Sequence, residues 1–367
     1  MRSSREVLER APPPRTWGRP SRPGQRLRTT MTSHGRTARP DMHTTERQLG
    51  DEAREAAGAI VLDGASPTFA SRLRWLVAGM RPHQWVKNGF LFAPLIFAHK
   101  LDDPSLLLRS AAAFLLFSFT ASAVYLGNDV LDVESDRRHP VKRLRPIASG
   151  KLPMGLASFA AVVLALASVG GALLLGIEVA LILAFYLAMN VAYSWRLKKI
   201  AFVDVGVIAT GFVLRVAAGA FAIGVAPSPW IFVCTFALAL YMGFGKRKHE
   251  ILAAQGAGHD GTAARKALGG YTLPRLDLAL VLAGILALAS YLLYTVAPGT
   301  TGRFGYWLAL TVPFPAFGIF RFHGLIVKAT RASSPTEALI TDPPFVINGA
   351  AGLAVVVAIV YALSGPA

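Results

Sequence analysis

The sequence predicts an all-α fold, a polytopic bundle of about nine transmembrane helices, on three observations. Hydrophobic residues make up 53% of the 367 residues and charged residues only 16%, whereas a soluble domain carries about 25% charge. From residue 85 onward, apolar stretches follow one another closely, each near the roughly 20 residues that a helix needs to cross about 30 Å of hydrocarbon. The connections alternate between rich and poor in Lys and Arg, as in multi-pass membrane proteins.

The same composition excludes other classes of protein. The formal net charge of +17 does not indicate nucleic-acid binding, because membrane topology explains where the basic residues lie. The chain has one cysteine, Cys234, within an apolar run, so neither a disulfide framework nor a cysteine-based zinc site is expected. The mean hydropathy of +0.45 makes the bilayer the expected solvent, and we expect no nucleic-acid partner.

The amino-terminal segment, residues 1–70, is expected to be a disordered basic tail, and residues 71–367 are expected to form the transmembrane domain. The tail is rich in Arg, Pro, Ser, Thr and Gly and lacks apolar periodicity over residues 1–49. Such a composition does not bury enough apolar surface to fold. It also lacks the apolar core of a signal peptide, and three internal methionines leave a later start site open.

Nine apolar stretches are expected to span the membrane as helices. They cover residues 85–98, 106–127, 154–175, 177–195, 203–224, 229–245, 276–297, 304–324 and 345–363, of which the first is short. The connections after the second, fourth, sixth and eighth stretches are strongly basic, whereas those after the third, fifth and seventh contain only Arg303. By the positive-inside rule, the amino terminus lies in the cytoplasm and the carboxyl terminus lies outside the cell membrane.

The strongest motif is NDVLDVESD at the cytoplasmic end of the second predicted helix. Its aspartates are spaced i, i+3 and i+7, which places them with the asparagine on one face of a continuing helix. Clustered carboxylates repel one another unless a cation neutralises them, and hard oxygen ligands suit Mg²⁺ bridging to substrate phosphates. The alternative is a solvated helix end paired with the arginines that follow it, although carboxylates at this depth are usually functional. The residues concerned are Asn128, Asp129, Asp132 and Asp136.

Basic residues follow the motif directly. The helix should end at His139–Pro140, because proline cannot continue it, and the next residues bring Lys142 and Arg145 close to the acidic face. Both are donors for phosphate oxygens, although membrane topology alone also explains them. Farther along, Arg215 lies about 16 Å into the fifth predicted helix. It should face the bundle interior and meet an acidic group or a substrate phosphate, or form a structural salt bridge, for example with Asp204.

The motif, the basic loop after it, the segment YSWRLKK at residues 193–199 and the nine spans together resemble the UbiA superfamily of intramembrane transferases. The resemblance extends from Arg81 to the carboxyl terminus. It implies a helical bundle around a central cavity, in which Mg²⁺ holds a diphosphate that leaves during transfer. The residues that the resemblance implies for catalysis and metal binding are Asn128, Asp129, Asp132 and Asp136.

The sequence departs from ordinary members, which carry a second aspartate-rich motif after the sixth helix; here GKRKHE stands in its place. With RPHQWVKN at residues 81–88, this pattern is similar to the phosphoribosyltransferase branch, whose members act on decaprenyl phosphate. That resemblance implies transfer of 5-phosphoribosyl from 5-phosphoribosyl diphosphate to a polyprenyl phosphate, with release of diphosphate, for cell-wall or surface polysaccharide precursors. The implied substrate-binding residues are Arg81, Lys87, Lys142, Arg145, Tyr193, Lys198, Lys246, Arg247 and Glu250.

Two other functions stay open. The first is a UbiA-type prenyltransferase that moves a polyprenyl group from its diphosphate to an aromatic acceptor such as 4-hydroxybenzoate, against which the missing second aspartate motif argues. The second is a transporter whose buried charges line a substrate path, against which the lack of an inverted repeat argues. The sequence also leaves open the length of the polyprenyl chain and whether the protein forms a homo-oligomer.

Overall fold

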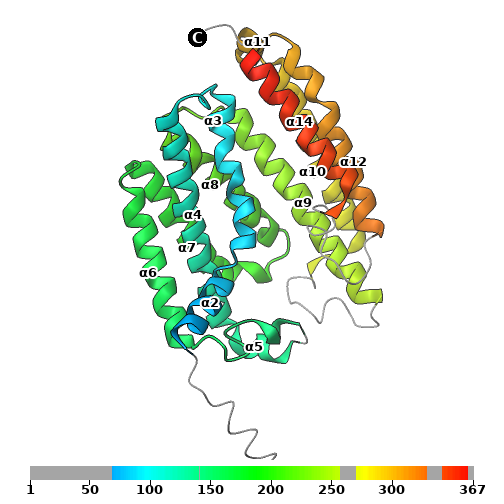
Figure 1. Ribbon diagram of the computed structural model, residues 1–367. Coiled ribbons are helices and arrows are strands. Elements are labelled where there is room, and N and C mark those ends of the chain that lie inside the picture. Colours follow the sequence, from blue (N-terminus) through cyan, green and yellow to red (C-terminus); the bar gives the residue numbers. More distant parts are fainter. Residues whose placement is uncertain (1–67, 140, 257–269, 329–340, 363–367) are drawn as a thin grey trace, which may run out of the picture. The chain divides into compact units, whose positions relative to one another are not determined.

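A computed structural model describes residues 68–139, 141–256, 270–328 and 341–362. All residues that the structure describes belong to one unit, Ser66–Ala367. Within the described residues every regular element is helical (Figure 1). The predicted disordered tail therefore lies outside the described residues, apart from its last positions, where α2 (Phe69–Met80) begins.

Eight helical segments of the described part are long and apolar enough to cross a membrane. Many of their apolar side chains face outward: only 11% of the apolar stretch of α6 is buried, and its Phe159 is 68% exposed. Exposed apolar surface on this scale contacts lipid, so the chain is a multi-pass membrane protein. The segments are α4 (Pro104–Leu131), α6 (Met154–Ala172), α7 (Ile177–Trp195), α8 (Val203–Ala222), α9 (Pro229–Gly256), α10 (Leu273–Val296), η5 (Trp307–Thr311) with α12 (Pro313–Lys328), and α14 (Pro343–Ala362).

Four short helices lie wholly within the described parts of the connections between these segments. They are α5 (Val133–Arg138), η2 (Lys142–Leu144), η3 (Leu197–Lys199) and α11 (Pro298–Phe304). The first three lie near the end of α4 that carries the acidic motif, whereas α11 follows α10 at the other end of the bundle (Figure 1).

The first predicted span, residues 85–98, is not an ordinary α-helix. It forms the 3₁₀ helix η1 (Pro82–Phe92), of 11 residues, and the short α3 (Ala93–Phe97), of 5 residues. A 3₁₀ helix rises about 2.0 Å per residue and an α-helix about 1.5 Å, so the two together reach about 30 Å. Arg81, just before η1, meets Asp129 near the end of α4, whereas Phe97 makes an edge-to-face contact with Tyr294 near the end of α10. This segment therefore runs from one end of the bundle to the other as a ninth crossing.

The sixth predicted helix is longer than expected. α9 continues to Gly256 rather than ending at residue 245, because lysine, arginine and glutamate are good helix formers once the chain leaves the apolar layer. The predicted substrate-binding residues Lys246, Arg247 and Glu250 therefore lie on a helix and not in a loop.

The helices pack as neighbours along the chain. α4 packs along α6 and α9 along α10, while α8 contacts both α7 and α9, so α9 lies between the amino-terminal and carboxyl-terminal helices in Figure 1. Among the described glycines, Gly219 in α8 marks the closest approach: a Cβ atom there would lie 1.9 Å from the carbonyl oxygen of Leu91 in η1. Glycine at this position therefore allows η1 to lie against α8, and η1 directly follows Arg81.

Candidate active site

The acidic motif lies where α4 ends. Asn128 and Asp129 are on its last turn, and Asp132 caps the helix with φ −95° and ψ 6° before α5 begins. The helix that was predicted to continue through the motif is thus interrupted at Asp132, so its four polar residues do not lie on one regular helix face. The predicted helix end at His139–Pro140 is confirmed, because α5 stops at the preceding residue.

Arg81 holds Asp129 from the junction between α2 and η1. Its Nη2 donates to both carboxylate oxygens of Asp129, at 2.6 and 2.8 Å, and its guanidinium lies 5.2 Å from the ring centre of Tyr125. The Arg81 backbone is left-handed, with φ 54° and ψ 60°, which is uncommon for a residue other than glycine. Sparsely populated backbone conformations cluster at functional sites, and this one belongs to a residue that pairs with the motif.

Arg145 joins two acidic residues from the loop after α5. Its Nη1 lies 3.1 Å from Asp129 and 2.6 Å from Asp136. His139 shapes this loop, because its Nδ1 accepts hydrogen bonds at 3.2 and 3.3 Å from two backbone N–H groups that follow it. Partial desolvation, with a smaller effect of the Lys142 charge, lowers the pKa of His139, which favours the neutral imidazole that this acceptor role requires.

The end of α7 supplies the third set of contacts. Lys198 in η3 places its Nζ 3.1 Å from a carboxylate oxygen of Asp132, and the Ser194 hydroxyl donates to the side-chain oxygen of Asn128. The α2–η1 junction, the loop after α5 and the α7–η3 segment thus each bring a cation to the acidic motif. The sequence places these segments far apart, and the bundle brings them together.

These groups line a cavity of about 380 Å³. The predicted residues that line it are Arg81, Asn128, Asp129, Asp132, Lys142, Arg145, Tyr193 and Lys198. Asp136 is buried and contacts the lining residue Arg145 directly. A cavity that offers both carboxylates and cationic donors can bind a phosphorylated ligand together with a divalent cation.

The cavity also contains residues that the sequence analysis missed. Tyr125, Ser135, Ser194 and Lys199 are part of its lining. Helix spacing gives a signal for Tyr125, because it lies one turn before Asp129 and so shares its face. Ser194 and Lys199 belong to the segment YSWRLKK, in which the sequence predicts only Tyr193 and Lys198 as substrate-binding residues.

Four predicted substrate-binding residues do not line this cavity: Lys87, Lys246, Arg247 and Glu250. Arg247 is almost fully buried, 2% exposed. Its Nε lies 2.8 Å from Asp204, and its Nη1 pairs with Glu250. In this conformation Arg247 and Glu250 are internal partners of a charge network rather than groups that face the cavity.

A tyrosine completes that network. The Tyr271 hydroxyl donates to Asp204 and accepts a hydrogen bond at 2.7 Å from the backbone N–H of Phe202. Burial, assisted by the hydrogen bond to Asp204, raises the pKa of the Tyr271 phenol. Phe202 has a positive φ of 67°, so the network fixes an unusual backbone turn at the start of α8.

Arg215 faces the bundle interior, as predicted, but it does not pair with Asp204. It is 5% exposed and donates at 2.7 Å both to the side-chain oxygen of Asn88 and to the carbonyl of Gly211. No carboxylate lies within 4 Å of its guanidinium in the part of the chain that the structure describes.

The half-buried Lys87 is within electrostatic range of Arg215, Arg81 and Lys246, so positive charge extends from the cavity toward the bundle interior.

The donor set at the motif suits a hard divalent cation. Three carboxylates and one side-chain amide oxygen are the ligand types that Mg²⁺ takes in proteins. Among the described residues no three His, Cys, Asp or Glu side chains converge on one point, because the motif aspartates contact Arg81, Arg145 and Lys198 instead. Asp132 nevertheless keeps 39% of its side chain exposed. The residues therefore fit a metal in their chemistry, and binding it would require the cations to exchange partners.

The bundle and its mixed acidic and basic cavity define an integral membrane protein with a polar site at one end of a helical bundle. The chain belongs to the UbiA prenyltransferase family, whose model matches residues 89–341. It is thus a transferase of the prenyltransferase type by family.

Relatives of known name refine this assignment. Decaprenyl-phosphate phosphoribosyltransferase of Mycobacterium tuberculosis is 36% identical over 278 residues, which cover 74% of this chain and 90% of the relative. The protein of the same name in Corynebacterium glutamicum is 34% identical over 292 residues, covering 78% and 86% of the two chains. A UbiA homologue from Archaeoglobus fulgidus, solved with DMAPP and Mg²⁺, has a TM-score of 0.59 at 17% identity, over 78% of this chain and 98% of that chain. The predicted UbiA-like helical membrane fold is confirmed.

Proposed function

We propose that this protein transfers the 5-phosphoribosyl group of 5-phosphoribosyl diphosphate to a polyprenyl phosphate and releases diphosphate. The lipid product would serve as a precursor for cell-wall or surface polysaccharide. Two relatives that match most of this chain are named for a phosphoribosyl transfer to decaprenyl phosphate. The sequence supports the same reaction, because the basic segment GKRKHE stands where prenyltransferases carry a second aspartate-rich motif.

The observation that carries the proposal is the pairing of every motif aspartate with a cation at the cavity. Asp129 contacts Arg81 and Arg145, Asp136 contacts Arg145, and Asp132 contacts Lys198. These cations are 25 to 30% exposed, so they can turn to the phosphate oxygens of a ligand. A donor with both a diphosphate and a separate 5-phosphate needs more cationic contacts than a prenyl diphosphate does.

The chemistry needs no strong general base. A phosphate oxygen of the acceptor, already anionic at neutral pH, attacks C1 of the ribose and forms the new C1–O bond. The bond between C1 and the diphosphate oxygen breaks, and the diphosphate leaves with the electron pair. Arg81, Arg145 and Lys198 would orient the two anionic substrates and offset charge on the leaving group, which is catalysis by positioning and electrostatics.

The metal expected from the sequence has a place in this proposal. Asp129, Asp132 and Asp136, with the side-chain oxygen of Asn128, would hold Mg²⁺, which when bound offsets the negative charge on the departing diphosphate. The exposed carboxylate of Asp132 is the simplest first contact for the metal, because only Lys198 pairs with it among the described residues.

The active site would face the cytoplasm, since the basic residues around it follow the positive-inside rule.

The test is an assay of detergent-purified protein with radiolabelled 5-phosphoribosyl diphosphate, a polyprenyl phosphate and Mg²⁺. We expect label in the organic phase, its loss with EDTA, and its recovery when Mg²⁺ is added back. Several polyprenyl chain lengths should be tried, because the sequence leaves that length open. Absence of labelled lipid with all of them would overturn the proposed transfer.

A further inference from the structure

A second cavity lies at the end of the bundle opposite the acidic motif. It has a volume of about 480 Å³ and is lined by α3, the α8–α9 connection, the start of α9, the end of α10 and α11. Arg109, near the start of α4, donates to the carbonyl of Ala222 at the end of α8, which places this connection at the Arg109 end. Arg109 and Asp129 are twenty residues apart on α4, about 30 Å at 1.5 Å per residue, so the two cavities are separate sites.

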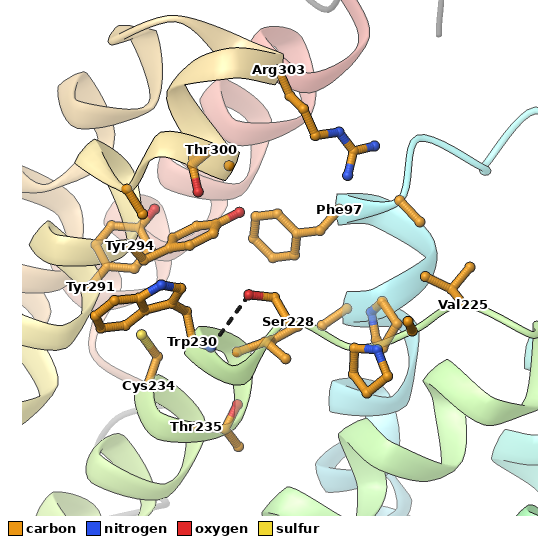
Figure 2. A pocket seen from close by; sticks show the side chains of 18 of the residues that line it. Phe97, Val225, Ser228, Trp230, Cys234, Thr235, Tyr291, Tyr294, Thr300 and Arg303 are labelled. Atoms are coloured by element: carbon orange, nitrogen blue, oxygen red, sulfur yellow. Dashed lines mark hydrogen bonds between the residues drawn. The ribbon is translucent and has the colours of Figure 1, made fainter.

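The lining is mostly apolar and aromatic, with one charged group. Figure 2 shows Phe97 and Tyr294 facing each other, Trp230 below them, and the guanidinium of Arg303 extending toward the same space from above. Among the described residues that line the cavity, Arg303 is the one charged side chain. Its guanidinium lies over the Phe304 ring, 5.4 Å from the ring centre, and within the described residues no carboxylate pairs with it. The cavity therefore combines an apolar interior with a cation that can receive an anion.

Aromatic residues close to Arg303 in the chain place that side of the cavity at the level of lipid headgroups. Just after α11, Tyr306 and Trp307 are 73% and 54% exposed, and exposed tyrosine and tryptophan gather at the membrane–water interface. Hydroxyl groups of Ser228 and Thr300 also belong to the lining and are hydrogen-bond donors for phosphate or ester oxygens. An apolar pocket that opens beside an interfacial arginine fits an amphiphile with an anionic head.

We propose that this cavity binds an anionic phospholipid of the bilayer, with its phosphate at Arg303 and the start of an acyl chain between Phe97 and Tyr294. The charge argument selects an anionic lipid over a zwitterionic one, because the lining supplies a positive charge and no negative one. The separation from the acidic motif selects a bulk phospholipid over the polyprenyl acceptor, whose phosphate must reach the other end of the bundle. The choice of a phospholipid over the polyprenyl acceptor rests on the proposed transfer reaction, whereas binding of an anionic lipid at Arg303 does not.

The single cysteine of the chain provides a direct probe, because Cys234 belongs to the lining of this cavity. The full-length protein is placed in phosphatidylcholine nanodiscs with increasing phosphatidylglycerol, and the rate of Cys234 labelling by N-ethylmaleimide is followed by mass spectrometry. We expect phosphatidylglycerol to slow labelling at least threefold in the wild type. Arg303→Gln should remove this protection, whereas Arg72→Gln, which removes an exposed arginine of α2, should retain it.

Several outcomes would overturn the proposal. They are labelling rates that do not depend on phosphatidylglycerol, equal protection in Arg303→Gln, and protection by added polyprenyl phosphate but not by phosphatidylglycerol. Thermal stability of both variants in phosphatidylcholine checks that Arg303→Gln is folded. If Cys234 resists labelling without phosphatidylglycerol, native mass spectrometry decides instead: the wild type and Arg72→Gln should retain a phosphatidylglycerol molecule that Arg303→Gln loses, and equal retention would contradict the site.

Discussion

The Arg81 guanidinium donates to both carboxylate oxygens of Asp129, at 2.6 and 2.8 Å, although the two residues are 48 positions apart. Asp129 is 4% exposed, so its charge depends on cations that the fold brings to it. Asp132, three residues later, is 39% exposed, and its carboxylate forms an ion pair only with Lys198 among the described residues. The buried Asp129 should therefore contribute more to the stability of the fold than the exposed Asp132.

That difference predicts separable effects of two substitutions. Asp132→Asn should abolish turnover with little change in thermal stability, because an exposed pair contributes at most about 1 kcal/mol. Asp129→Asn should also abolish turnover, but it should lower stability by roughly 1–3 kcal/mol, because Arg81 and Arg145 lose a buried charged partner. Thermal unfolding and Mg²⁺-dependent turnover measure the two effects. Full activity of Asp132→Asn would contradict its proposed role as a metal ligand.

Arg145 should act on the donor more than on the acceptor. Arg145→Lys keeps a charge beside Asp129 and Asp136, which both contact one nitrogen, Nη1. It removes the planar fork of further N–H donors that a phosphate group can use. Loss of one charged hydrogen bond, about 1.5–3 kcal/mol, corresponds to a rise in the donor KM of about tenfold or more. Arg143→Lys, an exposed position in the same loop, is the control and should leave both KM values unchanged. An equal rise in the acceptor KM would show that Arg145 does not discriminate between the substrates.

Lys246 and Arg247 are neighbours for which the structure predicts opposite outcomes. Arg247→Ala should destabilise the protein by about 3–5 kcal/mol, because it leaves buried Asp204 without its cation. The exposed Lys246 should tolerate Lys246→Ala, and its loss should raise the donor KM, since its charge acts near Lys87. Detergent-solubilised yield and thermal unfolding report the first effect and steady-state kinetics the second. An unchanged donor KM in Lys246→Ala would make this lysine a topology signal alone.

Gly219 should be needed to seat η1. In Gly219→Ala the new Cβ would lie 1.9 Å from the Leu91 carbonyl oxygen, so η1 must shift, at a cost of typically 1–3 kcal/mol for overpacking. Because η1 follows Arg81, turnover should fall as well as stability. Gly206→Ala is the matched control on the same helix, where a Cβ meets nothing within 4 Å, and it should be neutral or slightly stabilising. Equal stability of the two variants would show that η1 is not held by this contact.

The sequence predicted the long apolar helices well, because each carries its own length and hydropathy. It also predicted the segments that meet at the cavity, since clustered carboxylates where a membrane helix reaches the interface are usually functional. It did not predict η1, because a 3₁₀ crossing depends on close packing against Gly219, which lies in a distant helix. Nor did it separate Arg247 from Lys246, because adjacent residues on α9 point in different directions and only the position of Asp204 decides which one is buried.

The interruption at Asp132 shows the same limit on a smaller scale. Spacing placed the motif on one helix face, but a break of the helix between Leu131 and Val133 changes which carboxylates share a direction. Arg145 and Lys198 then contact different members of the motif. Contacts between distant segments therefore decide the geometry of the site.

The most direct test of the central claim offers both donor and acceptor pairs in one reaction. Purified protein would receive Mg²⁺, radiocarbon-labelled 5-phosphoribosyl diphosphate with a polyprenyl phosphate, and tritium-labelled polyprenyl diphosphate with 4-hydroxybenzoate. The account predicts radiocarbon in the polyprenyl phosphate product and no tritium on the aromatic acceptor. Tritiated prenyl benzoate without radiocarbon-labelled lipid would contradict it and establish prenyl transfer instead.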